Sequence, residues 1–249
     1  MNNETIILTD LAIGYKAKSH TTTIANNLNG TFRAGELTSL LGRNGCGKST
    51  LLRTITGFQQ KLSGDITLLG KPTEKYDIHE RALNVSIVTT EPTKVPGMTV
   101  FDLVAMGRSP HTGFWGRLSN SDRNIIEQSI AMVGMQEYAN RELSTLSDGE
   151  QQKCMIAKAI AQETPVIILD EPTSFLDYPS RVKTIALLRD LAHNLHKTII
   201  LSTHDLEQAV KFTDCLWLLD KQKGLTIGTP QELASSNAIN EYFDIESSL

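Results

Sequence analysis

Short apolar runs and longer segments of helical periodicity alternate along most of this chain. Apolar runs rich in β-branched side chains and bounded by Gly or Pro are typical of strands. By that criterion we expect strands at residues 5–15, 36–41, 65–70, 85–89, 166–170 and 198–203. The run at 166–170 is apolar at every position before its acidic end, which is typical of a strand buried on both faces of a parallel sheet.

Apolar side chains recur at helical spacing in three places after residue 97. They are Ile126, Ile130 and Val133; Met155, Ile156, Ala159 and Ile160; and Ile185, Leu188, Leu191, Ala192 and Leu195. Each set shares one face of a helix, so we expect helices there. Pro110, Gly113 and Gly116 instead predict a turn or loop over residues 107–116. The tail from Cys215 onward predicts strand, turn, strand and helix.

Strands that alternate with helices predict an α/β fold with a parallel core sheet and right-handed crossovers. The first and third expected strands indicate a small antiparallel β layer near the N-terminus. Residues of about 97–159 contain few strands of their own and predict an inserted helical subdomain. We therefore expect a single domain over residues 1–249, in which 1–96 and 160–249 form the core and the β layer.

Composition and charge argue against a nucleic-acid-binding, a membrane-spanning and a secreted protein. The 249 residues carry a net charge of −4 without a block of Lys or Arg, which gives no support to a nucleic-acid partner. No apolar run approaches the roughly 20 residues that span a membrane, and the first residues lack a secretion signal. Membrane association is therefore expected to go through a protein partner. The three distant cysteines have neither disulfide nor metal-ligand spacing, which fits a reducing cytoplasm.

A glycine-rich stretch after the second expected strand fits the pattern G-x-x-x-x-G-K-[ST]. It consists of Gly42, Arg43, Asn44, Gly45, Cys46, Gly47, Lys48, Ser49 and Thr50. Its glycines let backbone N–H groups point at phosphate oxygens, Lys48 adds positive charge, and the Ser49 hydroxyl can bind Mg²⁺. A helix that begins at about Gly47 places its partial positive end under the same anion. The stretch, called the phosphate loop below, predicts a nucleotide site.

The cysteines have different expected roles. Cys46 lies in the phosphate loop, where backbone amides and a helix N-terminus favour the thiolate. We therefore expect alkylating agents to block nucleotide binding. Cys154 and Cys215 are expected to be small core residues.

Two acidic residues, Asp170 and Glu171, end the apolar strand at 166–170. Asp170 can hold Mg²⁺ directly or through water, and Glu171 can polarise an attacking water. The alternative is a solvated acidic turn, but a phosphate loop upstream favours the catalytic interpretation. His204 follows the strand at 198–203, where it could contact the γ-phosphate or orient the water; a structural or capping histidine is the alternative.

These residues resemble the nucleotide-binding subunit of ATP-binding-cassette (ABC) transporters, and the likeness covers nearly the whole chain. The family motifs occur in order: the phosphate loop, LSDGE at 146–150, LDE at 169–171, SFLD at 174–177, and His204. The resemblance implies the P-loop NTPase fold of that family, with ATP and Mg²⁺ as ligands and ATP hydrolysis as the activity.

In that family two subunits enclose two ATP molecules head to tail. The resemblance implies that Ser147 and Gly149 contact the γ-phosphate bound to a second copy of the chain. It also implies that Asp177 links the two sites across the homodimer. Tyr15 matches the aromatic residue that stacks on adenine, with a strand-end tyrosine as the alternative.

Residues 99–111 resemble the corresponding segment in importers of iron–siderophore complexes, haem and cobalamin. In those importers this region receives a helix from a multi-span membrane permease, with which a solute-binding protein works. The subunit then lies at the cytoplasmic face of the inner membrane, held by the permease. Phe101 and Trp115 could supply part of the docking surface; core packing is the alternative for Phe101.

Three positions depart from the family pattern. Thr90, followed by Glu91, stands where a glutamine usually reaches Mg²⁺ and the attacking water, and Glu91 could substitute for it. Asp148 and Glu150 replace glycine and glutamine in the LSDGE motif. A carboxylate about 4 Å from a phosphate charge is repelled by roughly 4 kcal/mol at an effective dielectric near 20. We therefore expect Asp148 to point away from the nucleotide or to face a cation, and basal hydrolysis to be slow.

Two other functions stay open from the sequence. One is a soluble ABC ATPase that works on a ribosome, DNA or cluster assembly; such proteins often carry fused cassettes, long coiled coils or basic stretches, and none occurs here. The other is a regulatory nucleotide-binding subunit with weak catalysis, which the altered Thr90 and Asp148 leave open. Import rather than export rests on the resemblance, and the cargo is not encoded in these motifs.

Overall fold

The computed structural model describes residues 3–17, 20–89, 95–113 and 115–243. Its strands are β1 (Glu4–Lys16), β2 (Thr21–Arg33), β3 (Leu37–Leu41), β4 (Ser63–Leu68), β5 (Lys71–Pro72), β6 (Val85–Val88), β7 (Val166–Leu169), β8 (Thr198–Thr203), β9 (Cys215–Asp220) and β10 (Gly224–Gly228). Its α-helices are α1 (Lys48–Ile55), α2 (Ile78–Asn84), α3 (Val100–Ala105), α4 (Asn120–Met132), α5 (Asp148–Ala161), α6 (Tyr178–Leu195), α7 (Leu206–Phe212), α8 (Pro230–Ser235) and α9 (Ala238–Phe243). Short 3-10 helices are η1 (Thr73–Lys75), η2 (Met106–His111), η3 (Gln136–Tyr138) and η4 (Leu143–Thr145).

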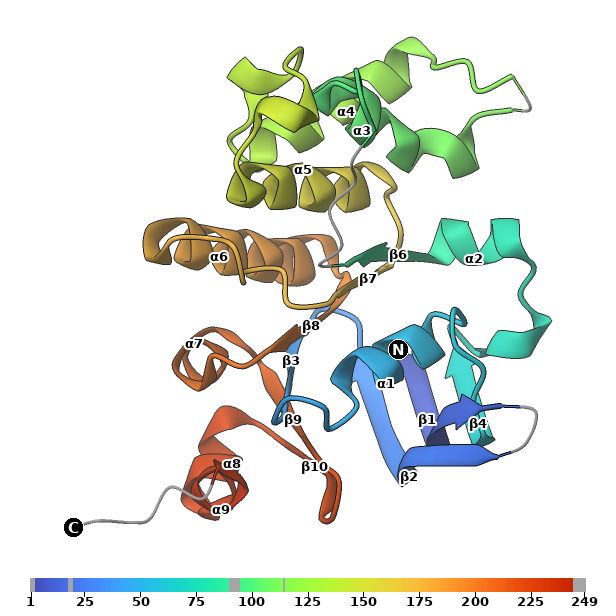
Figure 1. The fold of residues 1–249 in the computed structure, drawn as a ribbon, viewed down its shortest axis with the longest axis vertical. Helices are drawn as coiled ribbons and strands as arrows, with labels where there is room; N and C mark the ends of the chain where they lie inside the picture. The colour runs from blue at the N-terminus through green and yellow to red at the C-terminus, as the bar shows by residue number, and fades with distance from the viewer. Residues whose placement is uncertain (1–2, 18–19, 90–94, 114, 244–249) are drawn as a thin grey trace.

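The described strands form two sheets. The larger has the order β10-β9-β3-β8-β7-β6, with β10 antiparallel at one edge and the other five strands parallel. The smaller has the order β2-β1-β4-β5 and is antiparallel throughout. Figure 1 shows helices α3, α4 and α5 gathered at the end of the molecule away from the antiparallel strands. The predicted parallel core and antiparallel β layer are confirmed.

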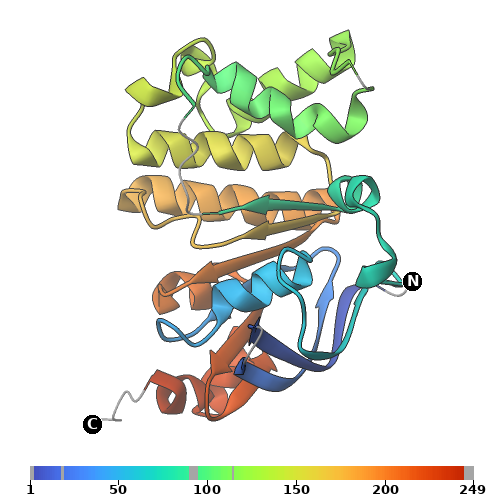
Figure 2. The ribbon, with the colours of Figure 1, turned by 45° about the vertical axis from the view of Figure 1, so that its right-hand side comes forward.

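Strand β7 contributes to two hydrophobic clusters because successive side chains point to opposite faces of the sheet. Ile167 and Leu169 pack with α5, α6 and the helices beyond them. Val166 and Ile168 pack on the opposite face with α1 and the antiparallel sheet. Helix α5 lies alongside α6 in both Figure 1 and Figure 2. Burial on both faces fixes the end of β7, where the two acidic residues begin.

The antiparallel sheet packs on the core through a shared hydrophobic cluster that includes one aromatic stack. Phe32 of β2 stacks on Trp217 of β9, with ring centroids 3.8 Å apart and planes inclined by 15°. Gly30 gives the tryptophan room, because a Cβ at that position would lie 2.6 Å from the Trp217 ring and 2.5 Å from Ile227. The contact holds β2 against β9, the neighbour of β3 in the core sheet.

The expected loop at 107–116 differs in the structure, because its first part is the 3-10 helix η2, which contains Pro110. Pro fixes φ near the value that 3-10 and α-helices share, so it is accommodated in a short helix of this kind. Gly107 lets η2 approach α5 closely, because a Cβ there would lie 2.4 Å from the carbonyl oxygen of Lys158.

Arg108 is buried and joins η2 to the two neighbouring helices. Its Nε donates to Asp122 Oδ1 at 2.9 Å, and its Nη1 donates to the Ala161 carbonyl at 2.7 Å and to Glu163 Oε2 at 2.8 Å. Asp122 Oδ2 also accepts hydrogen bonds from the hydroxyl and the amide of Ser119. The bonds from Ser119 and then Arg108 lower the pKa of Asp122 from 3.8 to about 2.

We expect Asp122→Asn to lower the free energy of unfolding by about 2 kcal/mol at neutral pH, since one pKa unit corresponds to 1.36 kcal/mol. The pKa of Asp122 is lower in the folded state than in the unfolded state. Its contribution is therefore fully present above about pH 4 and is lost as the pH falls toward 2. Urea unfolding of both proteins at pH 7 and pH 3 should show the difference narrowing; a difference that does not change with pH would contradict this account.

Candidate functional site

The candidate residues follow the carboxyl ends of three adjacent parallel strands. Strand β8 lies between β3 and β7 in the sheet. Leu41 pairs with Thr203, so the phosphate loop after β3 and His204 after β8 leave the sheet side by side. Asp170 follows β7, which runs in the same direction on the other side of β8. Ligands of open α/β sheets bind at this edge.

The phosphate loop has the geometry of an anion site. Gly47 has a backbone φ of 114°, in the left-handed region, and a Cβ there would lie 2.6 Å from the Ile24 side chain. Helix α1 begins at Lys48, with no acidic residue in its first turn. The Lys48 side chain is only 6% exposed, and its ammonium donates to the Gly42 carbonyl at 2.7 Å. An ammonium group and a helix N-terminus therefore meet at one place, which suits phosphate.

Cys46 differs from the prediction of a reactive thiolate. Its side chain is buried, and burial raises the pKa of the thiol above its ordinary 9.0, although Lys48 and backbone hydrogen bonds act in the opposite direction. The thiol packs beneath Gly42, where a Cβ would lie 2.4 Å from Cys46 Sγ. The prediction of a thiolate is wrong, because the effect of burial on the pKa is larger than the opposing effect of the helix N-terminus. Cys154 is a buried core residue as predicted, whereas Cys215 is partly buried.

Ser202 of β8 holds both acidic residues that follow β7. Its hydroxyl donates to Asp170 Oδ1 at 2.6 Å and accepts from the backbone N–H of Glu171 at 2.8 Å. Glu171 has φ of 47°, a strained value for a residue other than glycine, and such values cluster at functional sites. Ser202 was not predicted from the sequence, because its role depends on pairing between strands that are distant in the chain.

Glu171 and His204, which follow two adjacent strands, lie close together. Glu171 Oε2 is 3.8 Å from His204 Nδ1, and the imidazole is 64% exposed. The Ser174 hydroxyl lies 3.2 Å from the same Glu171 oxygen and 2.8 Å from the Glu171 carbonyl oxygen. The carboxylate and the imidazole are thus close enough to share a water molecule above the sheet edge.

Tyr15 stands beside the phosphate loop. It lies near the end of β1, is half exposed, and its hydroxyl is 3.2 Å from the Thr50 hydroxyl on α1. The ring is therefore accessible at the side of the loop. This position is compatible with the expected contact to a base.

The LSDGE motif begins helix α5. Ser147 is the N-cap, and its hydroxyl donates to Glu150 Oε2 at 2.9 Å while the Glu150 N–H donates back at 3.3 Å. The Ser147 N–H and hydroxyl lower the pKa of Glu150. Gly149 lets the helix approach the SFLD motif, because a Cβ would lie 2.9 Å from the Phe175 carbonyl. Asp148 is exposed.

The last residue of the SFLD motif lies at the start of α6. Asp177 is exposed and caps α6, where Oδ1 accepts from the Ser180 N–H at 2.9 Å; bonds from Ser180 lower the pKa of Asp177. Thr90 and Glu91 lie outside the described residues. Trp115 is 82% exposed. Phe101 is partly buried against the helical core, which favours the packing alternative for this residue.

Ser49 and Asp170 supply a hydroxyl and a carboxylate, the oxygen donors that Mg²⁺ prefers. Within the described residues, His, Cys, Asp and Glu form no group of three or more that could hold a metal ion. This donor set fits a Mg²⁺ that takes only one or two ligands from the protein and the others from phosphate and water.

A family model described as "ABC transporter" matches residues 25–174, more than half of the chain. The chain belongs to the ABC transporter family. This confirms the resemblance seen in the motifs. As an ABC ATP-binding subunit the chain is an ATPase, and the predicted fold class is that of its structural relatives. Across the described residues no helix has both the length and the apolar character needed to cross a membrane.

Curated relatives of this ABC subunit include two from iron uptake. It is 35% identical to the iron(3+)-hydroxamate import ATP-binding protein FhuC of Bacillus subtilis (strain 168), over 96% of this chain and 87% of that protein. It is 32% identical to the ferric enterobactin transport ATP-binding protein FepC of Escherichia coli (strain K12), over 90% and 82% of the two chains.

Solved structures of ABC cassettes are similar along most of their length. One is an inward-facing metal-chelate type ABC transporter, with a TM-score of 0.82 and 29% identity over 97% of this chain and 90% of that chain. Another is a dimeric ATP-binding cassette in a post-hydrolysis state bound to ADP and phosphate, with a TM-score of 0.79 and 25% identity over 90% and 98%.

Proposed function

We propose that two copies of this chain hydrolyse ATP to power an importer of iron–siderophore complexes, haem or cobalamin. The observation that carries the proposal is the meeting of the phosphate loop, Asp170 and the Glu171–His204 pair at one sheet edge. The names of the iron-uptake relatives support the cargo class. The chain would be held at the cytoplasmic face of the inner membrane by a multi-span permease that works with a solute-binding protein.

The chemistry follows from the positions of the side chains. When ATP binds, the Lys48 ammonium exchanges its hydrogen bond to the Gly42 carbonyl for bonds to the outer phosphates. Glu171 accepts a proton from water while the water oxygen attacks the γ-phosphorus, and the bond to the bridging oxygen breaks to leave ADP and phosphate. His204 orients that water. Ser49 and Asp170 would hold Mg²⁺, which neutralises charge that develops on the phosphates.

A second copy completes each site. Its Ser147 and Gly149 contact the γ-phosphate, and Asp177 links the two sites. In the free chain the Ser147 hydroxyl is already engaged by Glu150. Asp148 and Glu150 place two carboxylates in the first turn of α5, where an anion must bind, so closure is opposed and basal hydrolysis is slow.

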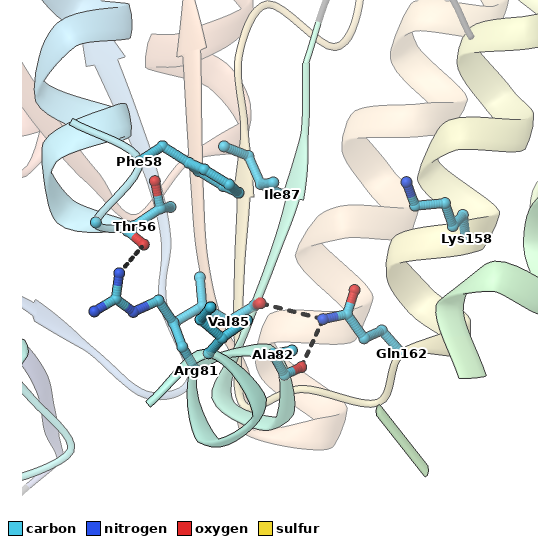
Figure 3. A pocket seen from close by; sticks show the side chains of 10 residues that line it. Thr56, Phe58, Arg81, Ala82, Val85, Ile87, Lys158 and Gln162 are labelled. Atoms are coloured by element: carbon cyan, nitrogen blue, oxygen red, sulfur yellow. Dashed lines mark hydrogen bonds between the residues drawn. The ribbon is translucent and has the colours of Figure 1, made fainter. Parts of the chain in front are cut away.

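The permease docks in a groove of about 430 Å³ between the core and α5. Figure 3 shows its walls, with Phe58 on the core side and Lys158 on α5. The side chains of Phe58 and Ile78 are 75% and 90% exposed and supply apolar contact area. Because the groove joins both parts of the chain, a segment seated in it would sense their relative movement.

Phosphate release from the purified chain, alone and with its own permease in lipid, tests this function. We expect slow release from the chain alone and a rate at least tenfold higher with the permease. Equal, negligible release in both samples would favour the regulatory subunit. Release that is rapid without a permease, from a chain that does not bind one, would favour the soluble ABC ATPase.

A further inference from the structure

Lys158 is a charged group in the docking groove that has no partner among the residues the structure describes. It lies on α5, one turn before Gln162, and its side chain lines the groove. Its ammonium makes no hydrogen bond or ion pair in the described part of the chain. Figure 3 shows Lys158 on the α5 side, with Phe58 and Ile87 on the other side of the groove.

The other polar groups of the groove are already engaged. Arg81 donates to the carbonyls of Thr56 at 3.4 Å and Thr73 at 3.0 Å. The Gln162 amide donates to a carbonyl of α2 at 2.6 Å and to one of β6 at 3.2 Å, and so ties α5 to the core. No Asp or Glu is among the described residues that line the groove. Its charge is therefore positive, and Lys158 is the cation of the groove whose ammonium has no hydrogen bond among the described residues.

Burial makes this arrangement unfavourable in the isolated chain. Loss of water around the ammonium lowers the pKa of Lys158, with no nearby carboxylate to compensate. A methionine would fill the same apolar space without that cost. An incoming carboxylate would remove the penalty, because a buried charge is tolerated when it is paired.

We infer that Lys158 recognises a single carboxylate on the permease segment that docks in this groove. The inference rests on the proposed function. The segment would present an apolar face to Phe58 and Ile78 and one Asp or Glu to Lys158. Ser147 caps the N-terminal end of α5, and Lys158 lies near its C-terminal end. The ion pair would therefore join the permease directly to the helix that contacts the ATP bound to the other copy.

The test uses the full transporter, purified with its own permease. A carbodiimide joins an amine to a carboxylate in contact, so mass spectrometry should find Lys158 cross-linked to one Asp or Glu of the permease. Lys158→Met should weaken permease association at least tenfold. Lys158→Arg should retain most of it. The control Lys75→Met removes an exposed lysine outside the groove and should change nothing.

Two further variants separate this inference from the docking site itself. Lys158→Glu should lose the permease, and a Lys in place of the cross-linked permease carboxylate should restore it. If Ile78→Asp releases the permease, Lys158→Met retains it and Lys158 of the wild-type chain forms no cross-link, the docking groove is supported and the role of Lys158 is overturned. If neither variant weakens association while the chain still hydrolyses ATP, the docking groove is also wrong. ATP binding by each isolated variant reports that it is folded.

Discussion

Glu171→Gln lowers the rate of ATP turnover by at least a hundredfold and leaves ATP trapped between two copies of the chain. This result is expected because a positioned general base contributes about 10²- to 10⁴-fold to a rate. Glutamine keeps the shape of the side chain and its bond from Ser174, but it cannot accept the proton of the attacking water. ATP binding survives, since Lys48 and the phosphate loop are unchanged.

Phosphate release and size-exclusion chromatography with ATP measure the two parts of this prediction. The control is Glu207→Gln, which neutralises an exposed carboxylate in the first turn of α7. The control should turn over at the wild-type rate and should not accumulate as a dimer. Wild-type turnover in the Glu171 variant would remove this residue from the role of general base.

Lys48→Met is expected to weaken ATP binding by roughly 10- to 100-fold, since a hydrogen bond to a charged group contributes about 1.5–3 kcal/mol. The ammonium is buried and already points at the loop carbonyl of Gly42, so it is pre-positioned to bind phosphate. Methionine has a similar length and fills the same space, which separates loss of charge from loss of packing.

Titration with a fluorescent ATP analogue measures this effect, with Lys75→Met as a lysine control outside the loop. AMP should be affected much less than ATP, because it lacks the outer phosphates that Lys48 binds. Equal weakening for both nucleotides would indicate a damaged fold, and unchanged ATP affinity would contradict the role of Lys48.

The sequence predicted elements whose patterns are regular and missed several others, among them β2, α2 and α7. Strand β7 is apolar at each of its four positions, and α6 repeats its buried residues at helical spacing. Strand β2 contains several Thr and Asn residues, and register shifts in its pairing with β1 interrupt the alternation of buried and exposed positions. The alternation typical of a strand is therefore too irregular in β2 to predict it from the sequence.

The parts of the site that are contiguous in the sequence could be predicted, whereas the parts that long-range contacts assemble could not. The phosphate loop is contiguous, so its spacing alone indicates its chemistry. The bonds from Ser202 to Asp170 and Glu171, and the groove around Lys158, bring together segments far apart in the chain. Cys46 is a case in which a local rule gave a wrong prediction. A helix N-terminus lowers the pKa of a thiol, but burial beneath Gly42 raises the pKa of Cys46 by more.

The central claim is that one ATP is bound by Lys48 of one copy and by Ser147 of another. A crystal structure of the Glu171→Gln variant grown with ATP and Mg²⁺ tests it most directly. The account predicts two ATP molecules buried between two copies, each with its γ-phosphate between those two residues. ATP bound away from the phosphate loop, or bound there without a second copy covering it, would contradict the account.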